Sequence, residues 1–209
     1  MQIFTMDNEP TLQKFINFIL RNRIRISFII FGTLLCEDLL FEGMRPHHLF
    51  RFKDIVGLFG LILIIIGIGL RSWAAGIIYK REKLATSGPY SLTRHPLYAG
   101  SFFMALGFCK ILADKENIWV IFALFLFIYF PKILEEESFL AKKYGEQWME
   151  YTRQTTIFFP KKIPKIKSKW SLAQWIKNRE YRAFITSVVA TVILELLSYY
   201  PLLDFLKIF

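Results

Sequence analysis

Long apolar segments separated by short charged ones dominate the chain. About 20 mostly apolar residues cross a bilayer, and fewer suffice where flanking side chains reach the interface. Five segments meet this requirement: residues 24–41, 56–70, 97–113, 118–134 and 184–203. Because backbone groups in lipid must find hydrogen bonds within their own segment, the pattern predicts helices and almost no sheet. The expected fold is all-α, a polytopic transmembrane helical bundle of about five spans.

The segments beside these spans add two expectations. Residues 11–20 carry apolar positions at helical spacing next to Lys14 and Arg21, which is typical of a helix lying in the membrane interface. Residues 114–117 leave room only for a tight turn, so the third and fourth spans should form a hairpin. We expect residues 1–209 to form a single integral-membrane domain.

Composition agrees with a membrane protein. The chain is 54% hydrophobic, and its mean hydropathy is +0.37. Its two cysteines, Cys36 and Cys109, lie far apart in apolar runs and predict neither a disulfide nor a metal site. We interpret the formal charge of +10 as cationic loops beside membrane spans, since no nucleic-acid-binding signature accompanies it. Membrane lipids, and not nucleic acid, are the expected partners.

The distribution of Lys and Arg predicts an orientation. With the N-terminus in the cytoplasm and five alternating spans, all but six of the 27 basic residues fall on the cytoplasmic side. The exceptions are Arg45, Arg51, Lys53, Lys110, Lys115 and Lys207. This orientation places residues 86–100 and residues 135–182 on one cytoplasmic face, where the two segments can meet. Whether the membrane is a plasma or inner membrane or the endoplasmic reticulum stays open.

The joint between the second and third spans, residues 86–100, carries more functional groups than a simple turn needs. It contains Gly88, Pro89, Tyr90, Arg94, His95, Pro96 and Tyr98. Hydrogen-bond donors, a titratable ring and two prolines of restricted backbone indicate a small-molecule site at the boundary between water and membrane.

A second cluster follows the fourth span. Glu135, Glu136 and Glu137 come directly after the helix leaves lipid, and aromatic residues then recur at three- and four-residue spacing. This spacing predicts an amphipathic helix with an aromatic face. Acids beside aromatic residues, with a His-Tyr pair nearby, suit a nucleoside with a zwitterionic tail. Carboxylates accept hydrogen bonds from ribose hydroxyls, apolar walls hold the base, and Arg, His and Tyr hold the carboxylate end.

Two sequence patterns lie within these clusters. Residues 94–100 read Arg-His-Pro-Leu-Tyr-Ala-Gly, which matches R-H-P-x-Y-x-G. Residues 136–140 and the following Tyr144, Gly145 and Tyr151 match E-E-x-x-L, [FY]-G and Y-x-x-Y, with Trp148 where a tyrosine is usual. Both patterns resemble the isoprenylcysteine carboxyl methyltransferase family and its phospholipid N-methyltransferase relatives. The resemblance covers roughly residues 84–160, which we expect to be the cofactor-binding catalytic core.

The resemblance implies an integral-membrane methyltransferase that uses S-adenosylmethionine in a cytoplasm-facing pocket. It implies that His95 and Tyr98 hold the methionine end of the cofactor and that Glu136 or Glu137 contacts the ribose. The turn formed by Gly88, Pro89 and Tyr90 is expected to supply backbone contacts, and Arg94, Tyr144 and Tyr151 are expected among the cofactor contacts as well. No G-x-G-x-x-G pattern argues for a soluble Rossmann-type enzyme.

The methyl acceptor is expected to be a lipophilic small molecule or a lipidated substrate. A carboxylate acceptor is ionised at neutral pH and needs no general base, so catalysis depends on alignment and exclusion of water. Arg153 is the residue expected to orient such an acceptor, because a guanidinium pairs with a carboxylate in bidentate fashion. An amine acceptor would have to lose a proton, to which Glu136 or Glu137 could contribute. The sequence leaves both acceptors open.

Other interpretations also remain. A sterol-reductase-like enzyme would bind NADPH at a similar pocket, although paired glutamates beside the ribose would repel its 2′-phosphate. A non-catalytic scaffold would use the same residues to cap helices. His47 and His48 have no third ligand at suitable spacing, so no metal is expected. Glu195 lies in the middle of a span and needs a partner, for which Arg71 is a candidate.

Overall fold

The structure is a computed structural model that describes residues 10–41, 43–80, 82–112, 116–158, 160 and 168–200. Its helices are α1 (Pro10–Cys36), α2 (Ile55–Ala75), α3 (Pro96–Ile111), α4 (Glu116–Leu124), α5 (Phe130–Tyr144), α6 (Glu146–Gln154), α7 (Leu172–Lys177) and α8 (Glu180–Tyr199). π-Helical turns continue α1 (η1, Glu37–Phe41) and join α4 to α5 (η3, Phe125–Tyr129), and η2 (Gly88–Ser91) is a 3-10 turn. The described residues contain no strand beyond an isolated bridge, so the all-α class is confirmed.

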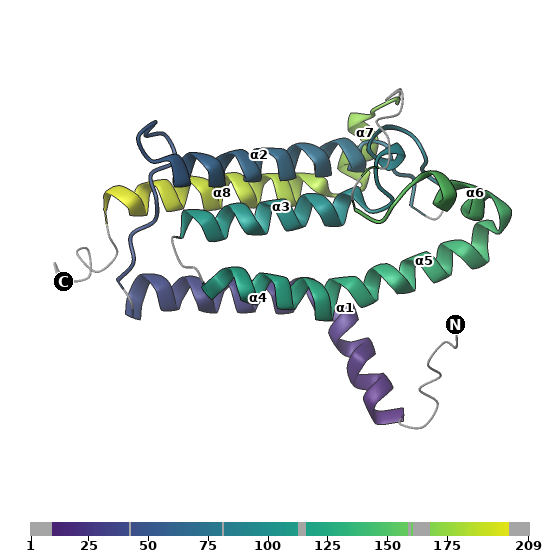
Figure 1. Cartoon of the computed structure of the whole chain (residues 1–209), viewed down its shortest axis with the longest axis horizontal. Coiled ribbons are helices and arrows are strands. Elements are labelled where there is room, and N and C mark those ends of the chain that lie inside the picture. The colour runs from purple at the N-terminus through teal and green to yellow at the C-terminus, as the bar shows by residue number, and fades with distance from the viewer. Residues whose placement is uncertain are drawn as a thin grey trace.

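Three of the described helices are long and apolar enough to cross a membrane: α2, the continuous run Glu116–Tyr144, and α8. α3 is apolar but has only 16 residues, which gives it a length of about 24 Å. Residues 11–20 and residues 24–36 of the first expected span lie in one continuous helix, α1, which bends between its N-terminal part and the part that runs along α4 (Figure 1). The structure therefore supports a helical membrane protein, while the count of about five spans is not confirmed.

The helices form two layers (Figure 1). α2, α3 and α8 lie side by side in one layer, and α4 and α5 run along the other with the C-terminal part of α1. The connection between α2 and α3 gathers with α6 and α7 at one end of both layers, on the right of Figure 1. The two clusters of the sequence therefore lie at the same end of the molecule.

α2 and α3 pack closely because glycines face one another along them. A Cβ on Gly67 would lie 2.5 Å from the carbonyl oxygen of Gly100, and a Cβ on Gly107 would lie 2.6 Å from that of Gly60. No side chain fits at such distances, and close approach through small residues is typical of helix pairs in membranes. This contact fixes α3 against α2 from the last residue of the motif, Gly100, onward.

Two ionisable residues of α8 have separate partners. Glu195 accepts a hydrogen bond from the backbone N–H of Leu49 at 2.7 Å. Arg71, the candidate partner of Glu195, instead binds Glu180 at 2.7 Å, so that candidate pair is wrong. Glu180 and Glu195 are about four helical turns apart, so only Glu180 lies at the end of the bundle that Arg71 occupies.

Candidate functional site

The loop after α2 enters the site through a tight turn at Gly88. This residue has a φ of +61°, a backbone conformation that glycine adopts without steric cost. A Cβ here would also lie 2.6 Å from Cδ1 of Ile77. The hydroxyl of Ser91 donates to the carbonyl of Gly88 at 2.6 Å and closes the turn. The turn carries Tyr90 into the protein, where its side chain is buried.

The R-H-P-x-Y-x-G pattern forms the N-terminus of α3. His95 is the N-cap residue and Pro96 is the first helical residue, where its fixed φ suits a helix and its missing N–H costs no hydrogen bond. His95 is buried, and its ring centroid lies 5.8 Å from that of Tyr98, one turn along the helix. The two residues expected to hold the cofactor's methionine end are therefore neighbours.

Glu137 joins the two sequence patterns. Its Oε1 accepts a hydrogen bond from Nε of Arg94 at 2.7 Å and lies 3.2 Å from Nε2 of His95. The three side chains are largely buried, at 11% exposure for Arg94, 3% for His95 and 19% for Glu137. Arg94 also donates from Nη1 to the carbonyl of Thr155 at 2.6 Å. A charge-assisted network of this kind holds the start of α3 against the middle of α5 and the C-terminus of α6.

The neighbouring acids have different environments. Glu136 is half-buried and shares a hydrogen bond with the hydroxyl of Tyr98. Glu135 is 56% exposed and pairs with Lys132 at 2.7 Å on the surface. Of the three consecutive glutamates, Glu136 and Glu137 contact the first motif and Glu135 does not.

α6 closes the site from the other side. Gly145, with a φ of +50°, lets the chain turn between α5 and α6. Trp148 and Tyr151 are buried on the inner face of α6, with ring centroids 5.7 Å apart. The hydroxyl of Tyr151 donates to the backbone carbonyl of Tyr90 at 2.6 Å. The ring centroid of Trp148 lies 6.0 Å from the guanidinium carbon of Arg94. At this position, where the family usually has a tyrosine, the indole therefore packs beside Arg94.

The residues after α6 also contact the first motif, a contact that the sequence analysis missed. Thr93 and Thr156 form a parallel bridge, and the backbone N–H of Arg94 donates to the carbonyl of Thr156 at 2.9 Å. The hydroxyl of Thr93 donates to the carbonyl of Ile157. All of these contacts use backbone groups on at least one side, and no residue pattern marks such groups, so the sequence analysis could not predict them.

Two buried phenols lie in this region outside the membrane-spanning segments. Burial raises the pKa of Tyr90 well above its usual value, and the charge of Glu136 raises it further. Burial likewise raises the pKa of Tyr151. Both side chains therefore stay neutral and can donate hydrogen bonds. The hydroxyl of Tyr90 has no hydrogen-bond partner among the described residues although it is buried, which is costly unless a ligand completes it.

Two of the expected site residues lie apart from this network. Tyr144 is half-buried, with the ammonium of Lys143 5.3 Å from its ring centroid. The Arg153 side chain is 77% exposed, and its guanidinium lies 3.5 Å from the carboxylate of Glu150. Arg23 of α1, which the sequence analysis did not single out, is half-buried, and its charge acts on Tyr98.

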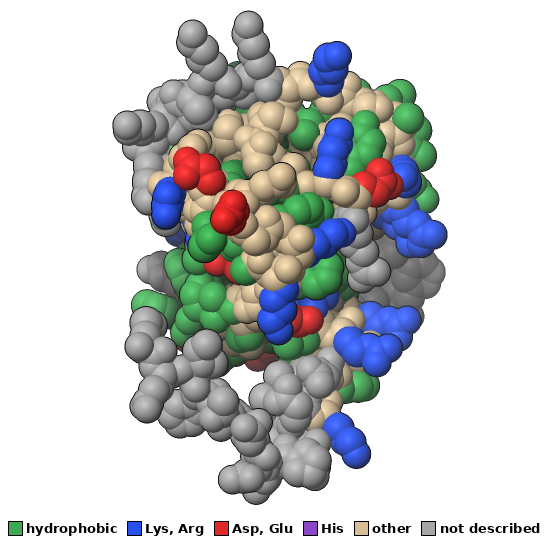
Figure 2. Space-filling model, turned by 90° about the vertical axis from the view of Figure 1, so that its right-hand side faces the viewer, with side chains coloured by type: hydrophobic (Ala, Val, Ile, Leu, Met, Phe, Trp, Pro, Cys, Tyr) green, Lys and Arg blue, Asp and Glu red, His purple; other side chains and the backbone are tan. Residues whose placement is uncertain are grey.

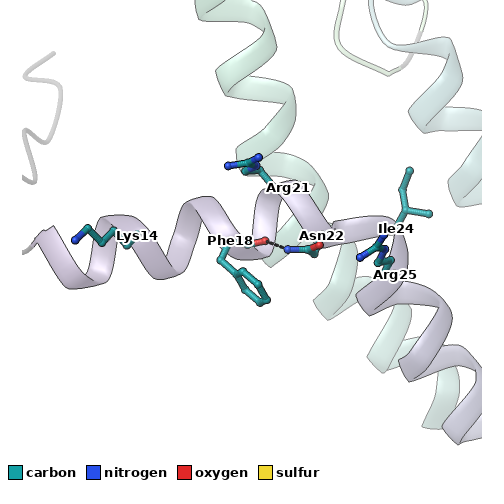
Figure 3. A pocket seen from close by; sticks show the side chains of 6 residues that line it. All are labelled: Lys14, Phe18, Arg21, Asn22, Ile24 and Arg25. Atoms are coloured by element: carbon teal, nitrogen blue, oxygen red, sulfur yellow. Dashed lines mark hydrogen bonds between the residues drawn. The ribbon is translucent and has the colours of Figure 1, made fainter.

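Two surface hollows lie away from the motifs. One runs along α1 and is lined by Lys14, Phe18, Arg21, Asn22, Ile24 and Arg25 (Figure 3). The other is apolar, against α4, η3 and the start of α5. Basic side chains of the first hollow suit anionic lipid headgroups. Across the described residues, no group of three or more His, Cys, Asp and Glu side chains is placed to hold a metal ion.

The molecular surface at the end that holds the motifs is rich in cations. Figure 2 views this end and shows Lys and Arg side chains spread over it, with fewer acidic ones among them. Such a surface is typical of the cytoplasmic side of a membrane protein.

Comparisons with known proteins place the chain in a family. A family model described as phospholipid methyltransferase matches residues 55–147. Protein-S-isoprenylcysteine O-methyltransferase A of Arabidopsis thaliana is 33% identical over 139 residues, which cover 60% of this chain and 67% of that protein. The chain belongs to the isoprenylcysteine O-methyltransferase family. The family model spans α2 to the start of α6 and leaves α1, α7 and α8 outside its match.

The chain is also similar to a metal-resistance protein and to a yeast methyltransferase. The cobalt-zinc-cadmium resistance protein CzcN of Cupriavidus metallidurans is 33% identical over 150 residues, covering 69% of this chain and 67% of that protein. The protein-S-isoprenylcysteine O-methyltransferase of Saccharomyces cerevisiae is 29% identical over 147 residues, covering 64% and 61%. The chain thus spans about two thirds of the length of these relatives. No solved structure matches it.

Proposed function

We propose that this chain transfers the methyl group of S-adenosylmethionine to the carboxylate of a lipophilic acceptor at the membrane interface. The observation that carries the proposal is the junction of both family motifs at Glu137, where Arg94 and His95 meet one carboxylate. The apolar helices around this junction suit an acceptor that enters sideways from lipid. We place the catalytic core at residues 84–160 and the active site on the cytoplasmic side, in line with the basic surface of this end (Figure 2).

The residues at the junction fit S-adenosylmethionine. The buried Tyr90 hydroxyl lacks a protein partner and can donate to a bound ligand. Glu136 remains accessible enough to accept from ribose hydroxyls, and Tyr98 lies beside it. His95 lies one turn from Tyr98 and completes the expected methionine end. When bound, the cofactor supplies an electrophilic methyl group on a sulfonium.

The protein's part in the reaction is to bind, align and exclude water. A carboxylate acceptor is already ionised, so Glu137 is not needed as a base. Its carboxylate is engaged by Arg94 and His95, which favours a role in holding these two side chains in place. The sequence proposes Arg153 as the cation that pairs with the acceptor carboxylate, but its side chain is largely exposed. Arg23 is the second candidate for this role, because it is half-buried and its charge acts on Tyr98.

A second acceptor class has one observation in its favour. The family model that matches residues 55–147 is described as phospholipid methyltransferase, which fits an amine acceptor. An amine must lose its proton before or during transfer, and Glu136 is then the carboxylate placed to accept it.

A labelled-methyl assay tests the proposal and separates the two acceptors. Purified protein in detergent is given S-adenosylmethionine with a radioactive methyl group and either S-farnesylcysteine or phosphatidylethanolamine. We expect label in the farnesylcysteine product that mild alkali releases as methanol, because methyl esters hydrolyse whereas N-methyl groups do not. Alkali-stable label in the phospholipid would support the amine acceptor instead. The absence of label from both lipids, in protein shown to be folded, would contradict the proposal for these two classes.

A further inference from the structure

Arg71, near the end of α2, joins α8 to the first turns of α3. Its Nε and Nη2 donate to the two carboxylate oxygens of Glu180 at 2.7 and 2.9 Å. Its Nη1 donates to the backbone carbonyl of Leu97 at 3.3 Å and to the hydroxyl of Ser101. The pair is largely buried, with 20% of the Arg71 side chain and 8% of the Glu180 side chain exposed.

The position of Glu180 is fixed by its surroundings. It is the first residue of α8, where a carboxylate is favoured by the helix dipole. The preceding Arg179 has a φ of +57°, which non-glycine residues rarely adopt and which persists only where neighbours impose it. One such neighbour is Asn178, whose Nδ2 donates to the carbonyls of Ala75 at 2.8 Å and Ile78 at 2.9 Å. The joint between α7 and α8 is thus attached to the end of α2.

On the other side, Arg71 contacts the family motif itself. Leu97, whose carbonyl it holds, lies between His95 and Tyr98 in the sequence. The glycine of R-H-P-x-Y-x-G also faces Arg71, since a Cβ on Gly100 would lie 2.7 Å from its Cγ. The motif therefore contains a residue whose small size admits the Arg71 side chain.

A buried ion pair rarely adds net stability over well-packed apolar residues of the same size. Apolar residues at positions 71 and 180 would fill the same space, but they could not hold the Leu97 carbonyl. We propose that Arg71 and Glu180 are positioning residues, through which α8 sets the first turn of α3 and with it His95 and Tyr98 for the cofactor. The inference deepens the proposed function and rests on it for the identity of the cofactor. It extends the working unit of the enzyme to a helix outside the family-model match.

The test compares variants of the full chain in detergent by three readouts: histidine spectra, cofactor affinity and melting temperature. The chain has three histidines, so ¹⁵N-histidine spectra of cofactor-free protein report on His95 directly, with His95→Asn for assignment. Calorimetry gives the affinity for S-adenosylmethionine. Glu180→Gln removes the charge at nearly constant size. Leu194→Ala, at a buried position of the same helix, controls for a loosened α8, and Glu82→Gln breaks the exposed pair with Lys177 by the same substitution.

We expect Glu180→Gln to shift the His95 signals, leave those of His47 and His48 unchanged, and weaken S-adenosylmethionine binding about tenfold, since it removes a charged hydrogen-bond partner. Neither control should move the His95 signals. Ser101→Ala spares the ion pair and should give a smaller shift of the same signals, so it serves if Glu180→Gln does not fold.

Two other results would overturn either the positioning role or the proposed function. If Glu180→Gln lowers the melting temperature as Leu194→Ala does, with His95 signals and affinity unchanged, the pair is only structural and the inference is overturned. If the wild type does not bind S-adenosylmethionine but Glu180→Gln still shifts His95, the positioning role stands and the proposed function fails.

Discussion

Glu135, Glu136 and Glu137 are chemically identical and adjacent, yet the structure gives them different energetic roles. Glu137 accepts from Arg94 at 2.7 Å and lies 3.2 Å from His95, with 19% of its side chain exposed. Substituting Glu137→Gln leaves one neutral oxygen to serve both partners and leaves the Arg94 guanidinium largely buried without its counter-charge. Hydrogen bonds to charged groups contribute about 1.5–3 kcal/mol, and a broken buried ion pair costs about 3–5 kcal/mol. We therefore expect Glu137→Gln to lower the free energy of unfolding by about 2–4 kcal/mol.

Glu135→Gln is the matched control. Glu135 is 56% exposed and pairs with Lys132 on the surface, and such pairs contribute about 0–1 kcal/mol. One kcal/mol corresponds to about 2–4 °C in melting temperature for a chain of this size. Thermal unfolding in detergent should thus show a decrease of roughly 5–15 °C for Glu137→Gln and at most a few degrees for Glu135→Gln. Equal melting temperatures for the two variants would refute the network around Glu137.

Three further predictions concern other parts of the molecule. Gly100→Ala should lower stability by about 1–3 kcal/mol, because its Cβ would lie 2.7 Å from Cγ of Arg71; thermal unfolding measures this, and an unchanged melting temperature would contradict the packing. Arg23→Gln and Arg153→Gln should leave the cofactor affinity unchanged, and the variant of whichever arginine binds the acceptor carboxylate should raise the acceptor KM about tenfold. An unchanged acceptor KM in both variants would exclude both arginines from this role. Burial alone would raise the pKa of Asp54, but its hydrogen bonds at the start of α2 lower it. Its stabilising effect is thus present above its unfolded pKa of about 4 and is lost as the pH falls through the folded value, so melting temperatures of Asp54→Asn should depend less on pH in acid than those of wild type.

The helical class and the meeting of the two motifs could be predicted from the sequence. Hydropathy sets where helices run, and the basic residues predicted which loops share a face. The contacts of Glu137 and Tyr151 with residues 86–100 follow once the two loops are at the same end. The meeting of these two segments could be predicted because charged and aromatic residues are concentrated in both of them.

Helix rotation and length were harder to predict. The partner of Arg71 is Glu180 and not Glu195, because the choice depends on where along α8 the two helices meet, which hydropathy does not encode. The pairing of Thr93 with Thr156 uses backbone groups that every residue has. α3 begins and ends within two residues of the expected segment 97–113, but its 16 residues are fewer than the roughly 20 that usually cross a bilayer. Arg153 followed from its spacing in the sequence, yet its side chain is largely exposed.

Binding of S-adenosylmethionine to the cofactor-free protein tests the central claim most directly. Calorimetry on detergent-purified wild type should give a Kd on the order of micromolar. His95→Ala and Glu136→Gln, one from each motif, should each abolish or strongly weaken binding, whereas Glu135→Gln should bind as wild type does. This result would establish that both motifs form one cofactor site. No heat of binding from folded wild type, or equal affinity in all four proteins, would contradict the claim.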